Sequence, residues 1–187
     1  MTPHRLILAL ALALLGGSAW AAAPAKPNAA DRKFVQEAAE GGLLEVQLGH
    51  LAVQKAADPQ VKEFGERMVT DHSKANDQLL SVASQLGITL PTKPSKEGQK
   101  AYDQLDKLSG TAFDRQYAAT MVQDHTKDVK AFTKQAQTGK NPDIRKFAAT
   151  TLPVLQEHLK MAKELEAKTR GVGGTGQKPV KQVIPQK

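Results

Sequence analysis

A short motif with an aspartate–histidine pair at its centre occurs twice in this chain. Residues 68–74 read Met-Val-Thr-Asp-His-Ser-Lys, and residues 121–127 read Met-Val-Gln-Asp-His-Thr-Lys. Residues 58–65 and 141–148 form a second related pair, because each has a capping side chain, then proline, then an aliphatic residue and a phenylalanine at matching positions. These repeats predict a chain built from two related helix pairs, with histidines placed in the middle of helices.

Apolar residues spaced alternately by three and four predict long helices that each bury one face. We expect four of them, over residues 31–57, 59–86, 112–138 and 142–167. Asp58-Pro59 and Asn141-Pro142 divide the two pairs, since a capping side chain followed by proline begins a new helix. The sequence therefore predicts an all-α four-helix bundle of two antiparallel helix pairs joined by a long linker.

Local signals suggest where the helices begin and how the pairs connect. Asp31 is the expected N-cap of the first helix, and Thr111 with Asp114 has the spacing of a capping box at the third. The linker over 90–110 has room for a short helix around 97–108. Its length fits either a simple turn or a crossover along the whole bundle.

Two consecutive glycines, Gly41 and Gly42, fall inside the first predicted helix. A glycine in a helix interior costs about 1 kcal/mol relative to alanine. We interpret the pair as a place where a neighbouring helix approaches closely, with local unwinding beside Glu45 as the alternative.

The two ends of the chain differ in composition from the helical part. Residues 1–21 have the pattern of a secretory signal peptide: Arg5, an apolar run, and Ala-Trp-Ala before the cleavage point. Residues 22–30 form a flexible Ala/Pro/Asn lead-in, and residues 168–187, rich in Gly, Pro and Lys, predict a disordered basic tail. We therefore expect an exported protein, periplasmic or associated with the outer envelope.

Charge and cysteine content narrow the classes of partner and chemistry. The chain has no cysteine, which excludes disulfides, thiolate metal sites and cysteine nucleophiles. Its net charge is +7. In an exported protein such a charge suits acidic envelope polymers or a membrane surface, through the basic tail, better than nucleic acid. The plainest alternative is a soluble basic surface, and we expect no transmembrane segment in the mature chain.

Each predicted long helix has one ionisable residue on its apolar stripe, namely Glu45, His72, His125 and His158. Glu45 and His72 are each 13 residues from the break at Asp58-Pro59. His125 and His158 are each 16 residues from the other break. At a rise of about 1.5 Å per residue, all four fall near the middle of the bundle, so the side chains can meet in one layer.

Three imidazoles and a carboxylate are suitable ligands for a divalent transition metal such as zinc, copper, iron or manganese. Asp71 and Asp124 each precede one of the histidines and would support the site as hydrogen-bond acceptors or further ligands. The alternative is a metal-free polar layer in which every histidine is hydrogen-bonded. No catalytic residue and no nucleotide cofactor is predicted, because the Gly-x-Gly-x-x-Gly at residues 171–176 follows a helix and precedes none.

Several ordered motifs resemble an exported bacterial family catalogued as domain of unknown function 4142. They are Gly-Gly-Leu-Leu-Glu-Val-x-Leu-Gly from Gly41, Met-Val-x-Asp-His-Ser-x-x-Asn from Met68, Phe-Asp-x-x-Tyr from Phe113 with the second Met-Val-x-Asp-His, and Leu-Pro followed by His158-Leu. The resemblance spans about Asp31 to Leu165. It implies a ferritin-like four-helix fold, and the family has no established activity.

This chain departs from the ligand pattern of the wider ferritin-like group, which holds two irons through Glu-x-x-His motifs. Val69, Val122 and Leu155 stand three residues before the histidines, so we carry over the fold and not the di-iron activity. We hypothesise a non-enzymatic bundle that binds a metal ion, in envelope metal handling or stress protection. The alternatives are a metal-free protein acting through its surface and basic tail, and a small redox enzyme.

Overall fold

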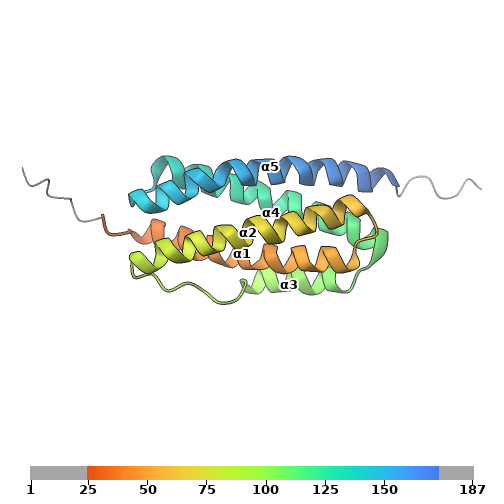
Figure 1. The fold of residues 1–187 in the computed structure, drawn as a ribbon, viewed down its shortest axis with the longest axis horizontal. Helices are drawn as coiled ribbons and strands as arrows, with labels where there is room; N and C mark the ends of the chain where they lie inside the picture. The colour runs from red at the N-terminus through yellow and green to blue at the C-terminus, as the bar shows by residue number, and fades with distance from the viewer. Residues whose placement is uncertain (1–24, 173–187) are drawn as a thin grey trace, which may run out of the picture.

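The computed structural model describes residues 25–172, and all regular structure in that part of the chain is helical (Figure 1). The helices are α1 (Ala29–Lys55), α2 (Pro59–Gln85), α3 (Lys96–Asp106), α4 (Gly110–Thr138) and α5 (Pro142–Val172). The all-α prediction is confirmed. The predicted signal peptide over 1–21 lies outside the described residues, as does the tail beyond α5, whose last turn takes in residues 168–172.

Two helix hairpins lie side by side along the long axis of the molecule (Figure 1). α1 packs chiefly against α2, and α4 chiefly against α5. After α2 the chain turns back along the bundle through α3, which lies against α1 and α4, so that α4 begins beside the α1–α2 turn. Of the two connections that the linker length permits, the chain therefore uses the crossover. None of the described helices combines the length and hydropathy needed to cross a membrane.

The expected caps of two helices are wrong. Asn28, not Asp31, is the N-cap of α1: its side chain accepts a hydrogen bond from the Asp31 amide at 2.8 Å, in a reciprocal capping box. At α4 the N-cap is Ser109, with no side-chain hydrogen bond, and the box of Thr111 with Asp114 does not form. Asp31 is the N3 residue of the box in α1, where its carboxylate accepts from the Asn28 amide at 3.2 Å, and both aspartates also accept hydrogen bonds from the opposite hairpin.

Asp31 and Asp114 each tie one hairpin to the turn of the other. The Asp31 carboxylate, 1% exposed, accepts hydrogen bonds from Gln135 Nε2 at 2.8 Å and from the amides of Lys140 and Asn141 at 3.1 and 3.0 Å. The Asp114 carboxylate, also buried, accepts from the amides of residues 57 and 58 at 3.1 and 3.0 Å. Burial raises the pKa of Asp31, but these hydrogen bonds outweigh burial and leave it below its usual value.

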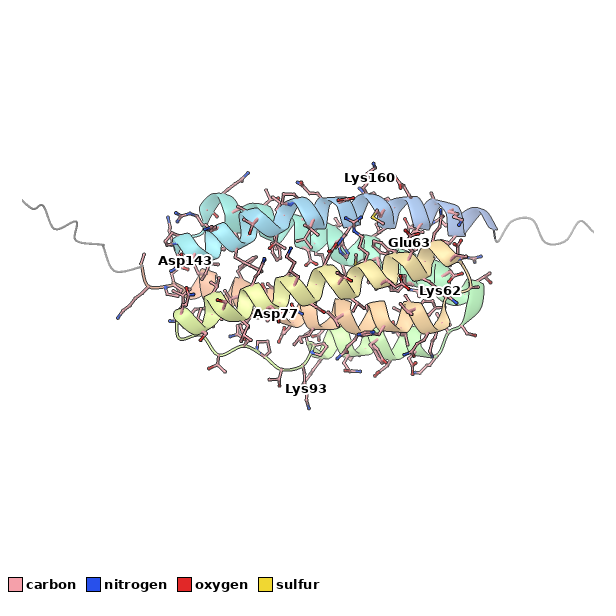
Figure 2. The ribbon with its side chains drawn as sticks, viewed as in Figure 1. Lys62, Glu63, Asp77, Lys93, Asp143 and Lys160 are labelled. Carbon is pink, nitrogen blue, oxygen red and sulfur yellow. The ribbon has the colours of Figure 1, made fainter. Side chains whose placement is uncertain are left out.

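The interior contains two apolar clusters with a polar layer between them. The cluster nearer the α1–α2 turn includes Leu48, Phe64, Met68, Tyr117, Met121 and Ala162. The other includes Phe34, Ala39, Leu79, Phe132, Ile144 and Leu155. Along each long helix, the polar residue Glu45, His72, His125 or His158 lies between members of the two clusters. Charged side chains such as those of Lys93 and Lys160 lie on the outside (Figure 2).

Glycines bring α1 and α2 together at one level. A Cβ atom at Gly49 would lie 2.7 Å from the Gly65 carbonyl oxygen, and one at Gly65 would lie 2.8 Å from the Gly49 carbonyl oxygen. A Cβ at Gly42 would lie 2.1 Å from Asn76 Oδ1, whereas one at Gly41 would have no neighbour within 4 Å. The expected close approach therefore holds for Gly42 and not for Gly41.

We predict that Asp31→Ala and Asp114→Ala each lower the free energy of unfolding by about 3 kcal/mol, because each substitution leaves buried amide donors without an acceptor. Denaturant unfolding monitored by circular dichroism measures the loss. Asp77→Ala, at an exposed position on α2 (Figure 2), is the control and should change stability by less than about 0.5 kcal/mol. Equal stabilities for all three variants would contradict the role of these two carboxylates.

Substitutions at Gly49 and Gly41 form a second matched pair of variants. Gly49→Ala should cost about 2 kcal/mol, because its methyl group meets backbone that cannot move aside. Gly41→Ala should raise stability by up to about 1 kcal/mol, since helix propensity improves and nothing is displaced. The same unfolding measurement decides, and a destabilised Gly41→Ala would show that this position is constrained by packing.

Candidate metal centre

The polar layer brings the four predicted residues together in the middle of the bundle. Glu45 is 2% exposed and His72 5% exposed, while His125 and His158 are fully buried. One ring nitrogen from each histidine lies within 4.8 Å of the corresponding nitrogens of the other two. The Phe64 ring closes one side of the layer, with its centroid 6.5 Å from that of His125 and 6.2 Å from that of His158. What the layer can bind depends on where the imidazole protons are.

The proton of His125 is on Nδ1. This nitrogen lies 3.1 Å from the Met121 carbonyl oxygen, one helical turn back, and 3.3 Å from Glu45 Oε1. A carbonyl oxygen can only accept a hydrogen bond, so Nδ1 donates. In a neutral imidazole the other nitrogen, Nε2, then carries a bare lone pair.

The proton of His158 is on Nε2. This nitrogen lies 2.8 Å from Asp71 Oδ2, across from α5 to α2. Burial raises the pKa of Asp71, but hydrogen bonds from His158 and from Arg67, whose Nε is 3.2 Å away, leave the pKa below its usual value. The carboxylate is therefore an ionised acceptor, and His158 Nδ1 has the bare lone pair.

His72 Nδ1 lies 2.9 Å from Glu45 Oε2. Its Nε2 is buried and has no hydrogen-bond partner. Burial lowers the pKa of His72 to about 4, with Asp128 and Asp71 opposing the shift. The contact with Glu45 is accordingly made by a neutral imidazole and is not a pairing of two charges.

The fixed protons leave an electrostatic conflict at the centre of the layer. His125 Nε2 and His158 Nδ1 are 3.3 Å apart, and both carry lone pairs instead of protons. An additional proton would relieve the conflict. Burial, however, lowers the pKa of His158 to about 4 and also lowers that of His125. Both rings are therefore neutral at neutral pH, and together with His72 they form a cluster that could hold a metal ion.

Glu45 lies beside the Nδ1 atoms of two rings, so in this geometry it orients His72 and His125 from outside the cluster of bare nitrogens. Burial raises the pKa of Glu45 to about 7, with the charge of His125 lowering it and that of Asp124 raising it. Its Oε1 makes no well-aligned hydrogen bond.

Asp124 and Asp128 complete the acidic side of the layer. Asp124 pairs with Lys127 on its own helix, and within residues 25–172 no hydrogen bond joins it to a histidine. Sequence reasoning missed Asp128, whose pKa burial raises well above its usual value, with the charge of Glu45 adding to the shift. The repeat could have found it: Asp128 follows Asp114 by 14 residues, just as Glu45 follows Asp31.

The opposing pKa shifts predict how the metal-free protein responds to acid. His72 and His158 have folded pKa values of about 4 against 6.5 unfolded, so stability falls as pH drops from 6.5 towards 4. Glu45, raised to about 7 from 4.5, opposes this loss, because the folded chain keeps a proton that the unfolded chain releases. Glu45→Gln should therefore steepen the loss between pH 6.5 and 4.5 by up to about 1.4 kcal/mol per pH unit. Urea unfolding at half-unit pH steps measures it, and an equal or shallower slope in the variant would contradict the assigned signs.

Comparison with known proteins gives one family and a set of structures with the same fold. The model of a domain of unknown function, DUF4142, matches residues 17–165. No match was found among curated proteins. The resemblance seen in the sequence motifs is thereby confirmed.

Three solved structures illustrate the fold. A DUF305 fragment from Deinococcus radiodurans is 12% identical, covers 77% of this chain and 99% of its own, and has a TM-score of 0.68. A DUF305 protein from Streptomyces coelicolor, provisionally described as secreted, is 11% identical over 75% of this chain and 92% of its own, with a TM-score of 0.65. CopM in its Cu(II)-bound form is 16% identical over 74% of this chain and 96% of its own, with a TM-score of 0.63. At such identities the likeness is one of fold alone.

Proposed function

We propose that this chain, which belongs to the DUF4142 family, binds one transition metal ion at the centre of its polar layer. The ligands are His72 Nε2, His125 Nε2 and His158 Nδ1. The observation that carries the proposal is the arrangement of the ring nitrogens: His125 and His158 each use their one proton on an acceptor outside the cluster, and His72 has a buried Nε2 without a partner. Histidines that bind metals are commonly oriented in this way, by a carboxylate or a carbonyl on the second nitrogen.

The distances suit an ion that is shared by imidazoles. With metal–nitrogen bonds of 2.0–2.1 Å, two ligand atoms of a tetrahedral ion are roughly 3.3 Å apart. His125 Nε2 and His158 Nδ1 are 3.3 Å apart. The ligand nitrogens of the three histidines all lie within 4.8 Å of one another, so small inward shifts of the rings complete the coordination.

Nearby carboxylates supply the compensating charge. A divalent ion held by three neutral imidazoles keeps its full charge in a buried site, which is costly unless that charge is paired. Glu45 and Asp71 contact the outer nitrogens of the ligands, and both are ionised above pH 7. Two negative charges therefore balance the ion. In this assignment both residues act as supporting acceptors, and Asp124 lies farther out.

Copper is the ion to test first, followed by zinc. Imidazole nitrogens suit both, and the solved structures of CopM with this fold contain Cu(II) and Cu(I). A cavity of about 20 Å³ beside His72 has room for a water molecule or an ion. This favours holding or transferring a metal over turnover of an organic molecule.

The four long helices serve as a ferritin-like four-helix frame for this site. The pattern of residues 1–21 indicates export, so the proposed role is metal handling or protection against metal stress in the cell envelope. A single ion held by nitrogen ligands, without bridging carboxylates, distinguishes this site from a di-iron centre.

Metal titration of the mature, chelator-treated protein tests the proposal. We expect one Cu(II) per chain by calorimetry, and stabilisation by about 2.7 kcal/mol when free metal is a hundredfold above Kd. His72→Ala, His125→Ala and His158→Ala should each abolish both effects, because two imidazoles do not complete the site.

The matched control is His50→Ala, which removes an exposed imidazole from α1 and should bind like the unmodified protein. Absence of binding with copper, zinc, iron and manganese would make the layer purely structural. Equal binding by His125→Ala would place the metal elsewhere.

A further inference from the structure

Two cavities meet in the middle of the molecule. The larger, of about 340 Å³, is lined by residues of α1, α3 and α4. The smaller, of about 20 Å³, has His72 in its wall. Gly41, Glu45 and Asp128 line both cavities, so they form the boundary between the outer cavity and the histidine layer.

We propose that the outer cavity is the path by which a hydrated transition metal cation reaches the histidines, with Asp128 and Glu45 as the carboxylates that pass it inward. This proposal rests on the function proposed above. It adds the route of entry and the residues that determine the rate of loading.

The lining of the outer cavity suits a cation. Four acidic residues line it, Glu45, Glu97, Asp124 and Asp128, against one basic residue, Lys127. Carboxyl groups gathered around one cavity favour a cation over an anion, and an entering cation stabilises their ionised form. Glu45 adds an independent observation at the boundary, because it is 2% exposed and its Oε1 makes no hydrogen bond.

Gly41 keeps the boundary open. It lies inside α1 with ordinary helical geometry, so no unusual backbone angle requires a glycine there. No helix packs on it either, since an added Cβ would have no neighbour within 4 Å, unlike those at Gly42 and Gly49. A glycine in this place destabilises the helix relative to alanine. What a glycine at position 41 provides is therefore free space between the two cavities.

The opposite side of the layer is closed by an ion-pair network. Asp71 accepts from His158, and Arg67 joins Asp71 at 3.2 Å to Glu157 at 3.0 Å. A cation arriving on that side would meet the Arg67 guanidinium first. The carboxylate-lined side therefore offers the more favourable approach.

Stopped-flow mixing of the metal-free mature protein with Cu(II), read by copper absorbance, tests the route. Gly41→Leu fills the boundary without touching a ligand, so association and dissociation should both slow by at least about tenfold while Kd stays within about twofold. Gly171→Leu, the same change at an exposed glycine near the end of α5, is the matched control and should leave both rates unchanged.

A second variant keeps the test decisive if Gly41→Leu folds poorly. Asp128→Asn retains the shape of the side chain and should slow association by about tenfold, with a weaker dependence on salt. Association rates equal to those of the unmodified protein in both variants would overturn the route and leave the metal site standing. Failure of the unmodified protein to bind Cu(II) or Zn(II) at equilibrium would overturn both proposals.

Discussion

The polar layer depends on where three buried imidazoles place their protons. A neutral imidazole has a single N–H, which His125 directs outward to the Met121 carbonyl oxygen and His158 to Asp71, while His72 Nδ1 lies against Glu45. The remaining nitrogens of His125 and His158 therefore turn their lone pairs towards one another in a buried layer. Burial opposes protonation of both rings, so the cluster that they form with His72 could accept a metal ion. The same hydrogen bonds that orient these two rings thus also leave one nitrogen of each free to act as a ligand.

The rest of the fold holds these rings at one level and keeps water away from them. Asp31 and Asp114 fasten each hairpin to the turn of the other, which fixes how far the two hairpins can slide along each other. Apolar clusters on both sides of the layer lower the local dielectric and strengthen every electrostatic interaction within it. The acidic cavity beside α3 is the exception, a polar opening that ends at Glu45. The same helices therefore form the frame of the bundle and position the residues of the polar layer.

Reasoning from the sequence located the long helices and the height of the polar layer, and it failed at the helix starts. The local sequence around Asp31 and Asp114 indicates a role at a helix start, and only the neighbouring hairpin reveals that their carboxylates accept from a distant turn. Asp128 was missed because it lies off the apolar stripe used to select candidates. Gly41 and Gly42 look alike in the sequence, yet only Gly42 faces another helix.

The sequence by itself determined the heights of the histidines, because the rise per residue of an α-helix is constant and the Asp-Pro and Asn-Pro breaks fix where counting begins. Tertiary structure decided the rotation of each helix about its axis, which no local spacing encodes. That rotation sends Asp71 to His158 on α5 and leaves Asp124 with Lys127. It also sets the Glu45 carboxylate against the Nδ1 atoms of His72 and His125.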